Sequence, residues 1–454
     1  MIACGRERRA RDLLPAIDRL FELSAAKIRA IEDGWDPADG APAFTVDGRY
    51  RARGWTEWTQ GFQFGSALLQ FDATGDRAFL ELGRARTVER MAPHLTHTGV
   101  HDHGFNNVST YGTLWRLAKE GAIDAAGDVP FYELALKASG AVQAARWTAI
   151  ADGGFIHSFN GPHSLFVDTI RTLRALALGH LLGHVLLQEQ DERVSLLDRL
   201  IDHARATAEF AVYYGRGRDA YDVRGRVAHE SLFNVVSGTY RGPATQQGYS
   251  PFTTWTRGLA WAMLGFAEQL EFLDAIGAPI DAFMLDAATA TCDYYLETAA
   301  AADGVPYWDV GAPGLAGLGD WGSRPADPFN DVEPVDSSAA AIAAQGLLRL
   351  GHYLADHQQD GARYTQAGLL ILDTLFDPAG PYLSTSPRHQ GLLLHSIYHR
   401  PGGWDHVPAG ARTPRGESSM WGDYHAREAA LYVQRLCRGP YLTFFGGARA
   451  PATT

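Results

Sequence analysis

The chain has 454 residues and a formal net charge of -12, with 46% of its residues hydrophobic and 20% charged. This composition is that of an ordinary globular protein with a sizeable core, which excludes global disorder. It also disfavours nucleic acid as a partner, because nonspecific binding depends on Lys and Arg side chains that contact phosphates. An anionic small substrate would need local donors that overcome the general negative field.

The N-terminal stretch 1–11 is charged and no apolar segment follows it, and no run of about 18 apolar residues occurs anywhere. Cys4, Cys292 and Cys437 are far apart and form no C-x-x-C pair. Such spacing argues against a disulfide framework or a thiolate metal site and favours a reducing compartment. We therefore expect a cytoplasmic protein that is neither secreted nor inserted in a membrane.

Helical periodicity dominates the chain, and segments with strand-like alternation are short and few. The amphipathic blocks predict about twelve helices, at roughly 10–33, 59–73, 77–93, 106–120, 127–146, 165–185, 191–214, 254–275, 280–299, 336–356, 359–376 and 423–437. Helices paired as successive hairpins suit an all-α (α/α)6 toroid. A helical solenoid is the competing architecture, but the chain shows no fixed sequence period of the kind that solenoids carry.

No linker rich in Ser, Gly or Pro divides the chain, so we expect one domain over residues 1–454. A short N-terminal extension over about 1–9 and a C-terminal tail over about 440–454 complete this organisation. Long irregular segments lie between the helical blocks, at about 215–253, 300–335 and 377–422. Loops of this length in a compact domain are usually functional, so we expect substrate residues there and at the adjoining helix ends.

Asp102 lies between His101 and His103, just before a helical block. Its position favours an N-terminal cap, whose carboxylate would accept backbone N–H groups, over a catalytic carboxyl. The neighbouring histidines invite a metal site. However, neither the pair His97 and His101 nor the pair at 180 and 184 includes the Glu of an H-E-x-x-H motif. We expect no metal.

Asp168 falls early in a strongly apolar predicted helix, where an ionised carboxylate would be costly unless it were paired. Burial would raise its pKa towards use as a general acid. Alternatively Arg171, three residues later on the same helix face, would pair with it and keep it ionised. If Asp102 and Asp168 meet in space, their mutual repulsion would let one of them keep a proton near neutral pH.

The segment 246–261 is the densest group of candidate binding residues. Arg257 and Trp261 share one face near the start of a predicted helix, whose exposed N–H groups favour anions such as a sugar carboxylate. Trp255 and Trp261 could pack against a pyranose ring, and Gln247 supplies an amide. The alternative for each is an ordinary core position. His229, in the preceding loop, could move a proton or orient a carboxylate. Further along, Asp336 fits a helix cap as well as it fits a binding residue.

Taken in order over residues 58–424, these pieces resemble the unsaturated glucuronyl hydrolases of glycoside hydrolase family 88. The matching pieces are Trp58-Thr59-Gln60-Gly61-Phe62, His101-Asp102-His103-Gly104-Phe105, Val167-Asp168-Thr169, Gln247-Gly248-Tyr249, Trp255, Arg257-Gly258, Ala260-Trp261, Val305-Pro306-Tyr307-Trp308-Asp309, Asp336-Ser337-Ser338-Ala339 and Gly422-Asp423-Tyr424. Each piece is short, but their ordered co-occurrence is specific. The family's fold is the (α/α)6 toroid, which the helix count suggests independently.

The resemblance implies an anionic oligosaccharide substrate, made by a polysaccharide lyase, with a 4,5-unsaturated uronic acid at its non-reducing end. The residue matching Asp168 protonates C4 and then removes a proton from the water that adds at C5. The hemiketal so formed rearranges and releases the remaining sugar. The residue matching Asp102 is the second essential aspartate. No cofactor is implied.

The same resemblance assigns binding roles. Residues matching His229, Gln247 and Arg257 bind the uronate end, and those matching Trp255 and Trp261 pack on sugar rings. Trp58 and Phe159 fall at further aromatic positions. Phe159 stands where a tryptophan is expected, and Gln63 replaces a second tryptophan after Trp58. These departures bear on the leaving sugar more than on the reaction.

Three other functions stay open at this point. An unsaturated rhamnogalacturonyl hydrolase would perform the same reaction on another substrate. A sugar epimerase can share the toroid and uses pairs of histidines, and a noncatalytic sugar-binding protein would need no acid. We expect a monomer or a homodimer.

Overall fold

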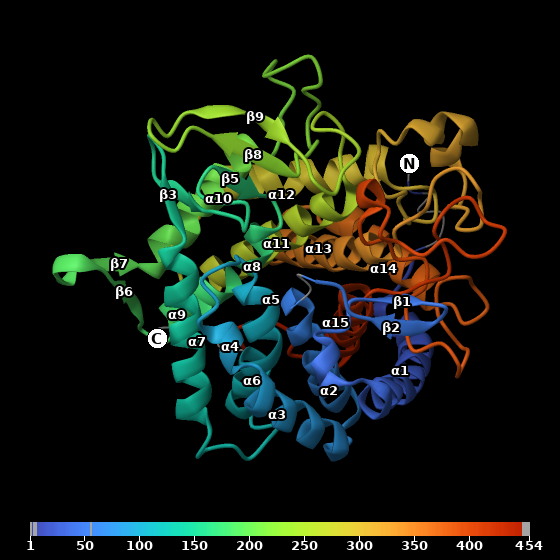
Figure 1. Ribbon diagram of the computed structural model, residues 1–454, viewed down its shortest axis with the longest axis horizontal. Coiled ribbons are helices and arrows are strands. Elements are labelled where there is room, and N and C mark those ends of the chain that lie inside the picture. The colour runs from blue at the N-terminus through green and yellow to red at the C-terminus, as the bar shows by residue number, and fades with distance from the viewer. Residues whose placement is uncertain (1, 3–6, 55–56, 447–454) are drawn as a thin grey trace.

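The computed structural model describes residues 2, 7–54 and 57–446. Among these residues, six helical segments form an inner ring in which each packs on the next and the last packs on the first. Figure 1 shows this closure, with the blue α2 near the red α15. The inner segments are α2 (Gln60–Thr74), α5–α6 (His103–Asn107 and Thr113–Lys119, joined by the π-helical turn Val108–Gly112), α8–α9 (Thr169–Thr172 and Arg174–Leu181), α11 (Thr256–Ala275), α13 (Ser337–Asp356) and α15 (Met420–Arg438).

Six outer helices alternate with the inner ones along the chain and pack around them. They are α1 (Leu14–Gly34), α3 (Arg77–Arg90), α7 (Val129–Ala145), α10 (Leu196–Phe210), α12 (Ala282–Tyr294) and α14 (Ala362–Phe376), with the short α4 (Ala92–Leu95) after α3. The alternation and the closed ring confirm the (α/α)6 toroid and exclude an open solenoid.

Outer helices are buried on one face only, whereas inner helices are buried on all sides. The outer α1 buries Ile17, Leu20, Ile28 and Ile31, which lie at helical spacing on one face. The inner α11 is buried at every residue from Thr256 to Leu273, because protein surrounds it on all sides. A helix or helical segment overlaps each of the twelve predicted blocks.

Glycines let the inner helices approach one another closely. A Cβ added at Gly104 of α5 would lie 2.2 Å from the carbonyl oxygen of Thr172 in α8, and one at Gly61 of α2 would lie 2.4 Å from the Cα of Asn106 in α5. Glycines with close contacts to a neighbouring inner segment occur at all six interfaces of the ring, at Gly61, Gly104, Gly265, Gly346, Gly422 and Gly65.

Short strands decorate the ring. They are β1 (Phe44–Val46) with β2 (Arg49–Arg51), β3 (Trp147–Ala149) with β4 (Gly154–Ile156), β6 (Val185–Leu187) with β7 (Arg193–Ser195), and a three-stranded antiparallel sheet of β5 (Ser164–Phe166), β8 (Glu230–Phe233) and β9 (Tyr240–Ala244). The β6–β7 hairpin projects from the body in Figure 1. The prediction of one continuous helix over 165–185 is wrong, because its first residues pair with β8 and the helix starts only at Thr169.

The end of the ring opposite the cavity described below is closed. Phe444 and Phe445, at the start of the predicted C-terminal tail, are buried and pack on Phe272 of α11 with ring centroids 5.8 and 5.6 Å away. Above them lies a buried ion network, in which Arg171 pairs with Glu268 at 3.0 Å and with Glu428 at 2.8 Å. The interior of the ring is therefore filled rather than open through its length. No helix in the described part of the chain is both long and apolar enough to cross a bilayer.

Candidate active site

A cavity of about 700 Å³ lies at one end of the ring. Eight of the nine residues singled out from the sequence line it, namely Trp58, Asp102, Phe159, Asp168, Gln247, Trp255, Arg257 and Trp261. Ten more residues complete the lining, namely Glu57, His97, Gly99, Val100, His101, Phe105, Gln246, Tyr398, His399 and Trp404. Two of the three long segments predicted to carry substrate residues do so, whereas the segment 300–335 contributes none of this lining.

The lining residues converge because the inner helices begin at this end. Trp58, Asp102, Asp168 and Trp255 each stand one or two residues before the first residue of α2, α5, α8 and α11. Trp421 at the start of α15 stacks on Trp58 with centroids 5.0 Å apart, which brings that helix to the same end. Helix N-termini carry positive partial charge, so these helix ends contribute a local preference for an anion, which acts against the carboxylates of Glu57, Asp102 and Asp168 in the same lining.

His101, Asp102 and Asp168 form a buried trio on the cavity wall. His101 Nε2 lies 3.7 Å from Asp102 Oδ1 and 3.5 Å from Asp168 Oδ2. One oxygen or nitrogen atom of each side chain lies within 4.8 Å of the others. The two aspartates therefore meet in space, as the acid chemistry requires, and an imidazole stands between them.

The trio distributes its charge unevenly. Burial opposes charge on His101, but the two carboxylates outweigh it and raise the pKa of the imidazole. Burial raises the pKa of the Asp102 carboxyl although His101 opposes the shift. Burial would also raise the pKa of Asp168, but the charge and hydrogen bond of His101 lower it. Asp102 and His101 therefore hold protons more readily than Asp168, to which the sequence assigns the acid role.

The prediction that Asp102 caps a helix is wrong. Asp102 occupies the position before α5, but its carboxylate makes no capping hydrogen bond and faces His101 instead. His103 is structural, since its ring nitrogens contact Ser139 Oγ at 3.0 Å and the carbonyl of His97 at 3.1 Å. Burial lowers the pKa of His103 to about 4, so it is neutral.

The alternative in which Arg171 pairs with Asp168 is also wrong. Asp168 is the N-cap of α8 and has helical backbone angles, so the spacing from Asp168 to Arg171 is helical, yet the two side chains do not pair. Arg171 is fully buried and turns to Glu268 and Glu428 in the barrel interior. Asp168 Oδ1 has no hydrogen-bond partner among the described residues, and it is the acceptor that a substrate or water could use.

Arg257 is present at the cavity wall but its charge is already paired. Its Nη1 contacts Asp336 Oδ2 at 2.7 Å, and its Nη2 donates to the Tyr398 carbonyl at 2.7 Å and to Gln247 Oε1 at 2.9 Å. The guanidinium thus fixes the side-chain orientation of Gln247 and the loop at Tyr398. Asp336, for which cap and binding role were open, accepts from Ser338 N and Ala339 N as a cap while it pairs with Arg257.

His229 stands behind the cavity wall. Its backbone carbonyl accepts from Val167 N at 3.0 Å, so the pairing of β5 with β8 sets His229 beside Asp168. Its Nδ1 accepts from Gln246 N at 3.0 Å, and burial lowers its pKa to about 4. The neutral ring supports the loop that carries Gln246 and Gln247. Sequence reasoning found the residue but not this arrangement, because the strand went unrecognised.

Aromatic rings make up much of the remaining wall. Phe159 lies parallel to the His101 ring at 6.0 Å, and Phe105 packs on Trp261 at 4.8 Å. Trp404 packs on His399 at 4.2 Å. His399 and Trp404 were not named from the sequence, although their segment was expected to reach the site. Apolar faces with a few polar groups are typical of carbohydrate and cofactor pockets.

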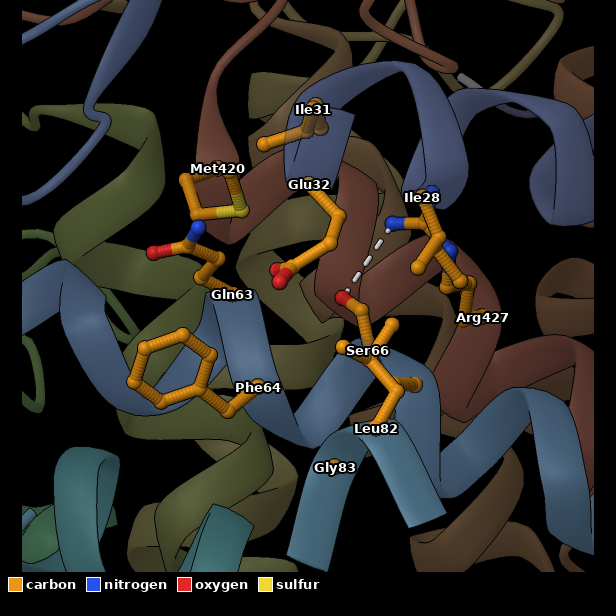
Figure 2. Close-up of a pocket in the computed structure, with 11 residues that line it drawn as sticks. Ile28, Ile31, Glu32, Gln63, Phe64, Ser66, Leu82, Gly83, Met420 and Arg427 are labelled. Carbon is orange, nitrogen blue, oxygen red and sulfur yellow. Dashed lines mark hydrogen bonds between the residues drawn. The ribbon is translucent and has the colours of Figure 1, made fainter. Parts of the chain in front are cut away.

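Two other features of the predicted site can be placed. Of the two histidine pairs that kept an epimerase open, the pair at 180 and 184 is outside the cavity lining, whereas His97 and His101 belong to it. A second cavity of about 20 Å³ lies between α1, α2, α3 and α15, where Arg427 Nη1 donates to Ser66 Oγ at 3.3 Å (Figure 2). None of the site residues predicted from the sequence lines this cavity, so we place the chemistry in the larger one.

Comparisons with known proteins agree with this geometry. A profile of the family described as Glycosyl Hydrolase Family 88 matches residues 43–293, more than half of the chain. The chain is 27% identical over 391 residues to an unsaturated glucuronyl hydrolase of Bacillus sp. strain GL1, covering 85% of this chain and 88% of that protein. It is 27% identical over 426 residues to an unsaturated chondroitin disaccharide hydrolase of Streptococcus pyogenes serotype M1, covering 91% and 90%.

Solved structures share the fold. The crystal structure of the Bacillus sp. GL1 unsaturated glucuronyl hydrolase superposes with a TM-score of 0.70 at 24% identity, covering 94% of this chain and 98% of that one. An unsaturated glucuronyl hydrolase specific for heparin superposes with a TM-score of 0.73 at 20% identity, covering 94% and 99%. With the profile match over more than half of its length, the chain belongs to Glycosyl Hydrolase Family 88.

Proposed function

We propose that the protein removes a 4,5-unsaturated uronic acid from the non-reducing end of oligosaccharides made by polysaccharide lyases. The observation that carries the proposal is the trio of His101, Asp102 and Asp168 on the wall of a cavity at which the inner helices begin. The names of the relatives support the same substrate class.

The reaction is a hydration of the vinyl ether. A proton passes from Asp168 to C4 while the C4=C5 bond opens, water adds its oxygen to C5, and the proton of that water returns to Asp168. The hemiketal at C5 then collapses to a ketone, which breaks the bond between C5 and the ring oxygen and leaves a hemiacetal at C1. This hemiacetal forms an aldehyde when the bond from C1 to the leaving sugar breaks, and the sugar departs as an alcohol with the proton of the C1 hydroxyl. One water is consumed and no redox change occurs.

His101 reconciles this role with the lowered pKa of Asp168. The imidazole lies between the two carboxyls, so it can pass its proton to Asp168. A uronate carboxylate bound nearby raises the pKa of Asp168, because like charges disfavour ionisation. The carboxylate of Asp102 stabilises the charged imidazolium of His101, so that the proton stays on one of the three side chains of the trio.

The walls select the shape of the substrate. The amide of Gln247, fixed by Arg257, and the positive ends of the inner helices suit the uronate end. Trp58, Phe159, Trp255 and Trp261 offer faces for sugar rings. Within residues 7–54 and 57–446, neither Cys292 nor the exposed Cys437 forms a disulfide, which supports a reducing, cytoplasmic location.

The test is the turnover of unsaturated disaccharides, followed by loss of the ultraviolet absorbance of the conjugated enol carboxylate. Asp168→Asn and Asp102→Asn should each lower kcat by about 10²–10⁴, which is the usual contribution of general acid–base groups. Asp198→Asn, on the exposed face of α10, is the matched control and should leave kcat unchanged. In deuterated water, deuterium should appear at C4 of the product.

Other outcomes distinguish the alternatives. Turnover within a few-fold of wild type in Asp168→Asn would contradict the assigned role. An altered sugar with undiminished absorbance would indicate an epimerase, and binding without turnover would indicate a sugar-binding protein. A panel of disaccharides with different leaving sugars would separate a glucuronyl from a rhamnogalacturonyl substrate.

A further inference from the structure

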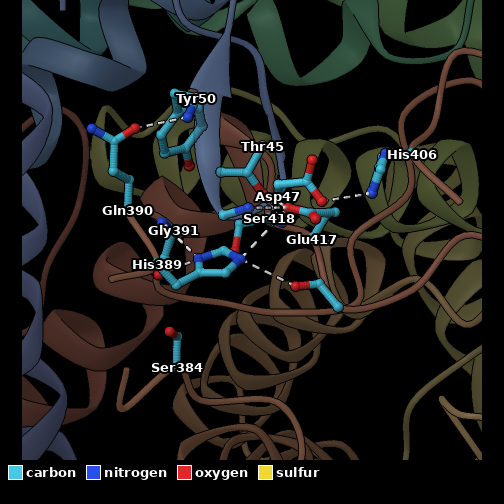
Figure 3. A network of polar contacts seen from close by, with 12 residues as sticks. Thr45, Asp47, Tyr50, Ser384, His389, Gln390, Gly391, His406, Glu417 and Ser418 are labelled. Atoms are coloured by element: carbon cyan, nitrogen blue, oxygen red, sulfur yellow. Dashed lines mark hydrogen bonds and ion pairs between the residues drawn. The ribbon is translucent and has the colours of Figure 1, made fainter. Parts of the chain in front are cut away.

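A second group of potential metal ligands lies outside the active-site cavity, where the turn between β1 and β2 meets the loop before α15. One oxygen or nitrogen atom each of Asp47, His406 and Glu417 lies within 4.8 Å of the others. His406 Nε2 is 3.2 Å from Asp47 Oδ1, as Figure 3 shows. The three side chains come from two segments more than 350 residues apart in the sequence, so their approach is a product of the fold.

The carboxylates of this group have no basic partner other than histidine. Among the described residues, Asp47 pairs with His406, and Glu417 lies 3.6 Å from His389 Nε2, but neither carboxylate pairs with Lys or Arg. His389, Thr45 Oγ1 and Gly48 N already stabilise the negative charge of Glu417, and His406 that of Asp47. A divalent cation bound between the two carboxylates would add to this stabilisation.

The protein already orients these ligands. Glu417, which lies beside Thr45 in Figure 3, accepts a hydrogen bond from Thr45 Oγ1. It also accepts one from Gly48 N, and the two bonds hold the carboxylate towards the turn. The Asp47 side chain is 84% exposed and that of His406 is 22% exposed, so the site is open to solvent and an ion can enter without local unfolding. An open position would leave room for water on the metal.

We propose that Asp47, His406 and Glu417 bind a divalent transition-metal cation, with Zn²⁺ as the fitting ion. One imidazole and two carboxylates suit Zn²⁺, whose nitrogen and oxygen ligands lie at about 2.0–2.2 Å. All-oxygen sites, by contrast, suit Ca²⁺ and Mg²⁺. Small side-chain movements would bring the three ligand atoms to that distance, and water would complete the coordination.

The position of the site gives it a structural consequence. His406 follows Trp404, which lines the active-site cavity, and Asp405, whose carboxylate accepts from the backbone N–H groups of Tyr398 and His399. A cation shared between Asp47 and His406 would tie this wall of the cavity to the β1–β2 turn. The site would therefore stabilise the wall without touching the reacting atoms, and it is independent of the proposed reaction.

The test is calorimetric titration of the full chain with Zn²⁺, together with the shift of the thermal midpoint on adding Zn²⁺. Losing one ligand should weaken zinc binding by at least about tenfold, since even residues that only orient ligands change affinity by about 10–100-fold. His406→Ala and Asp47→Asn are expected to lose the saturable binding and the midpoint shift. Asp47→Asn suits the turn, because the backbone of Asp47 has φ +50 and asparagine tolerates this region.

His357→Ala is the matched control, because this exposed histidine pairs with Asp274 elsewhere on the surface and should leave zinc binding unchanged. The trio at the active site offers the other set of metal-binding atoms, so His101→Gln is titrated in parallel. The proposal is overturned if wild type binds no Zn²⁺ up to millimolar concentration. It is equally overturned if His406→Ala retains wild-type affinity or if binding is lost only in His101→Gln.

Discussion

His101 is the residue on which the proposed proton transfer most depends. It lies close to both aspartates, is almost fully buried, and packs against the rings of Phe159 and Phe166. With the imidazole charged, the trio stores one transferable proton. Without it, two carboxyls would have to share that proton directly.

The variant His101→Gln therefore tests whether His101 holds the proton that is transferred. With His101 gone, its charge no longer lowers the pKa of either carboxyl, and the proton would be shared by the carboxyl pair alone. We expect the alkaline limb of the pH profile of kcat/KM to change position, in addition to a fall in kcat of about 10² or more. A fall in kcat with an unmoved alkaline limb would mean that His101 only supports the structure.

Eight of the nine site residues predicted from the sequence, both aspartates among them, line the cavity. The sequence did not reveal what their side chains contact. Asp102 looked like a cap because position alone favours that role, and its partner His101 was considered only as a metal ligand. The pairing of Arg171 with Glu428 joins residues 257 positions apart, and no local spacing could reveal it. Contacts of this kind are set by the ring, not by neighbours in the chain.

At the scale of elements, the close approach of α5 and α8 brings Asp102 to Asp168. Gly104 follows Asp102 by two residues and permits this approach, because any Cβ there would overlap the Thr172 carbonyl. The same glycine belongs to the His-Asp-His-Gly-Phe motif. Gly104 therefore sets the distance between the carboxyls of Asp102 and Asp168 as well as allowing two helices to pack.

Gly104→Ala should lower both stability and turnover. Overpacking a filled core costs about 1–3 kcal/mol, and backbone atoms at 2.2 Å put this variant at the upper end of that range. Urea unfolding measures the loss, and kcat measured under folding conditions should fall because Asp102 moves away from Asp168. Gly127→Ala, where nothing lies within 4 Å, is the control. Equal stability of the two variants would refute the close-packing argument.

Helical periodicity made the twelve helices of the toroid predictable, since each outer helix needs one apolar face. The strand β5 was missed because its residues, Ser164–Phe166, run directly into the apolar helix that follows, and three residues carry no period of their own. Strand pairing with β8 is a contact between distant segments. That pairing, rather than helix propensity, places Asp168 at the cavity.

For the whole molecule, burial of neutral histidines makes stability depend on pH. Burial lowers the pKa of several histidines to about 4 or about 3, namely His94, His103, His203, His229, His395 and His425. The unfolded chain takes up protons at these residues below its ordinary histidine pKa of about 6.5, and the folded chain does not. The free energy of unfolding should therefore decrease as the pH falls from about 6.5 towards 4.

Urea unfolding at a series of pH values measures this decrease. Each such histidine contributes about 1.4 kcal/mol per pH unit within that window. His203→Gln should reduce the dependence of the free energy of unfolding on pH by about the contribution of one histidine. His357→Gln, at the surface, is the control and should leave this dependence as in wild type. A slope unaffected by His203→Gln would contradict the assignment of a neutral buried ring.

The plugged end of the ring has one further consequence. Phe444 and Phe445 pack on Phe272, and charged side chains fill the interior of the ring above them. The active-site cavity therefore opens at one end of the barrel only, within the described residues. Only the end of a sugar chain can reach the bottom of such a cavity. Both products must leave through the same opening by which the substrate enters. The larger fragment must leave through this opening before the next substrate molecule can enter.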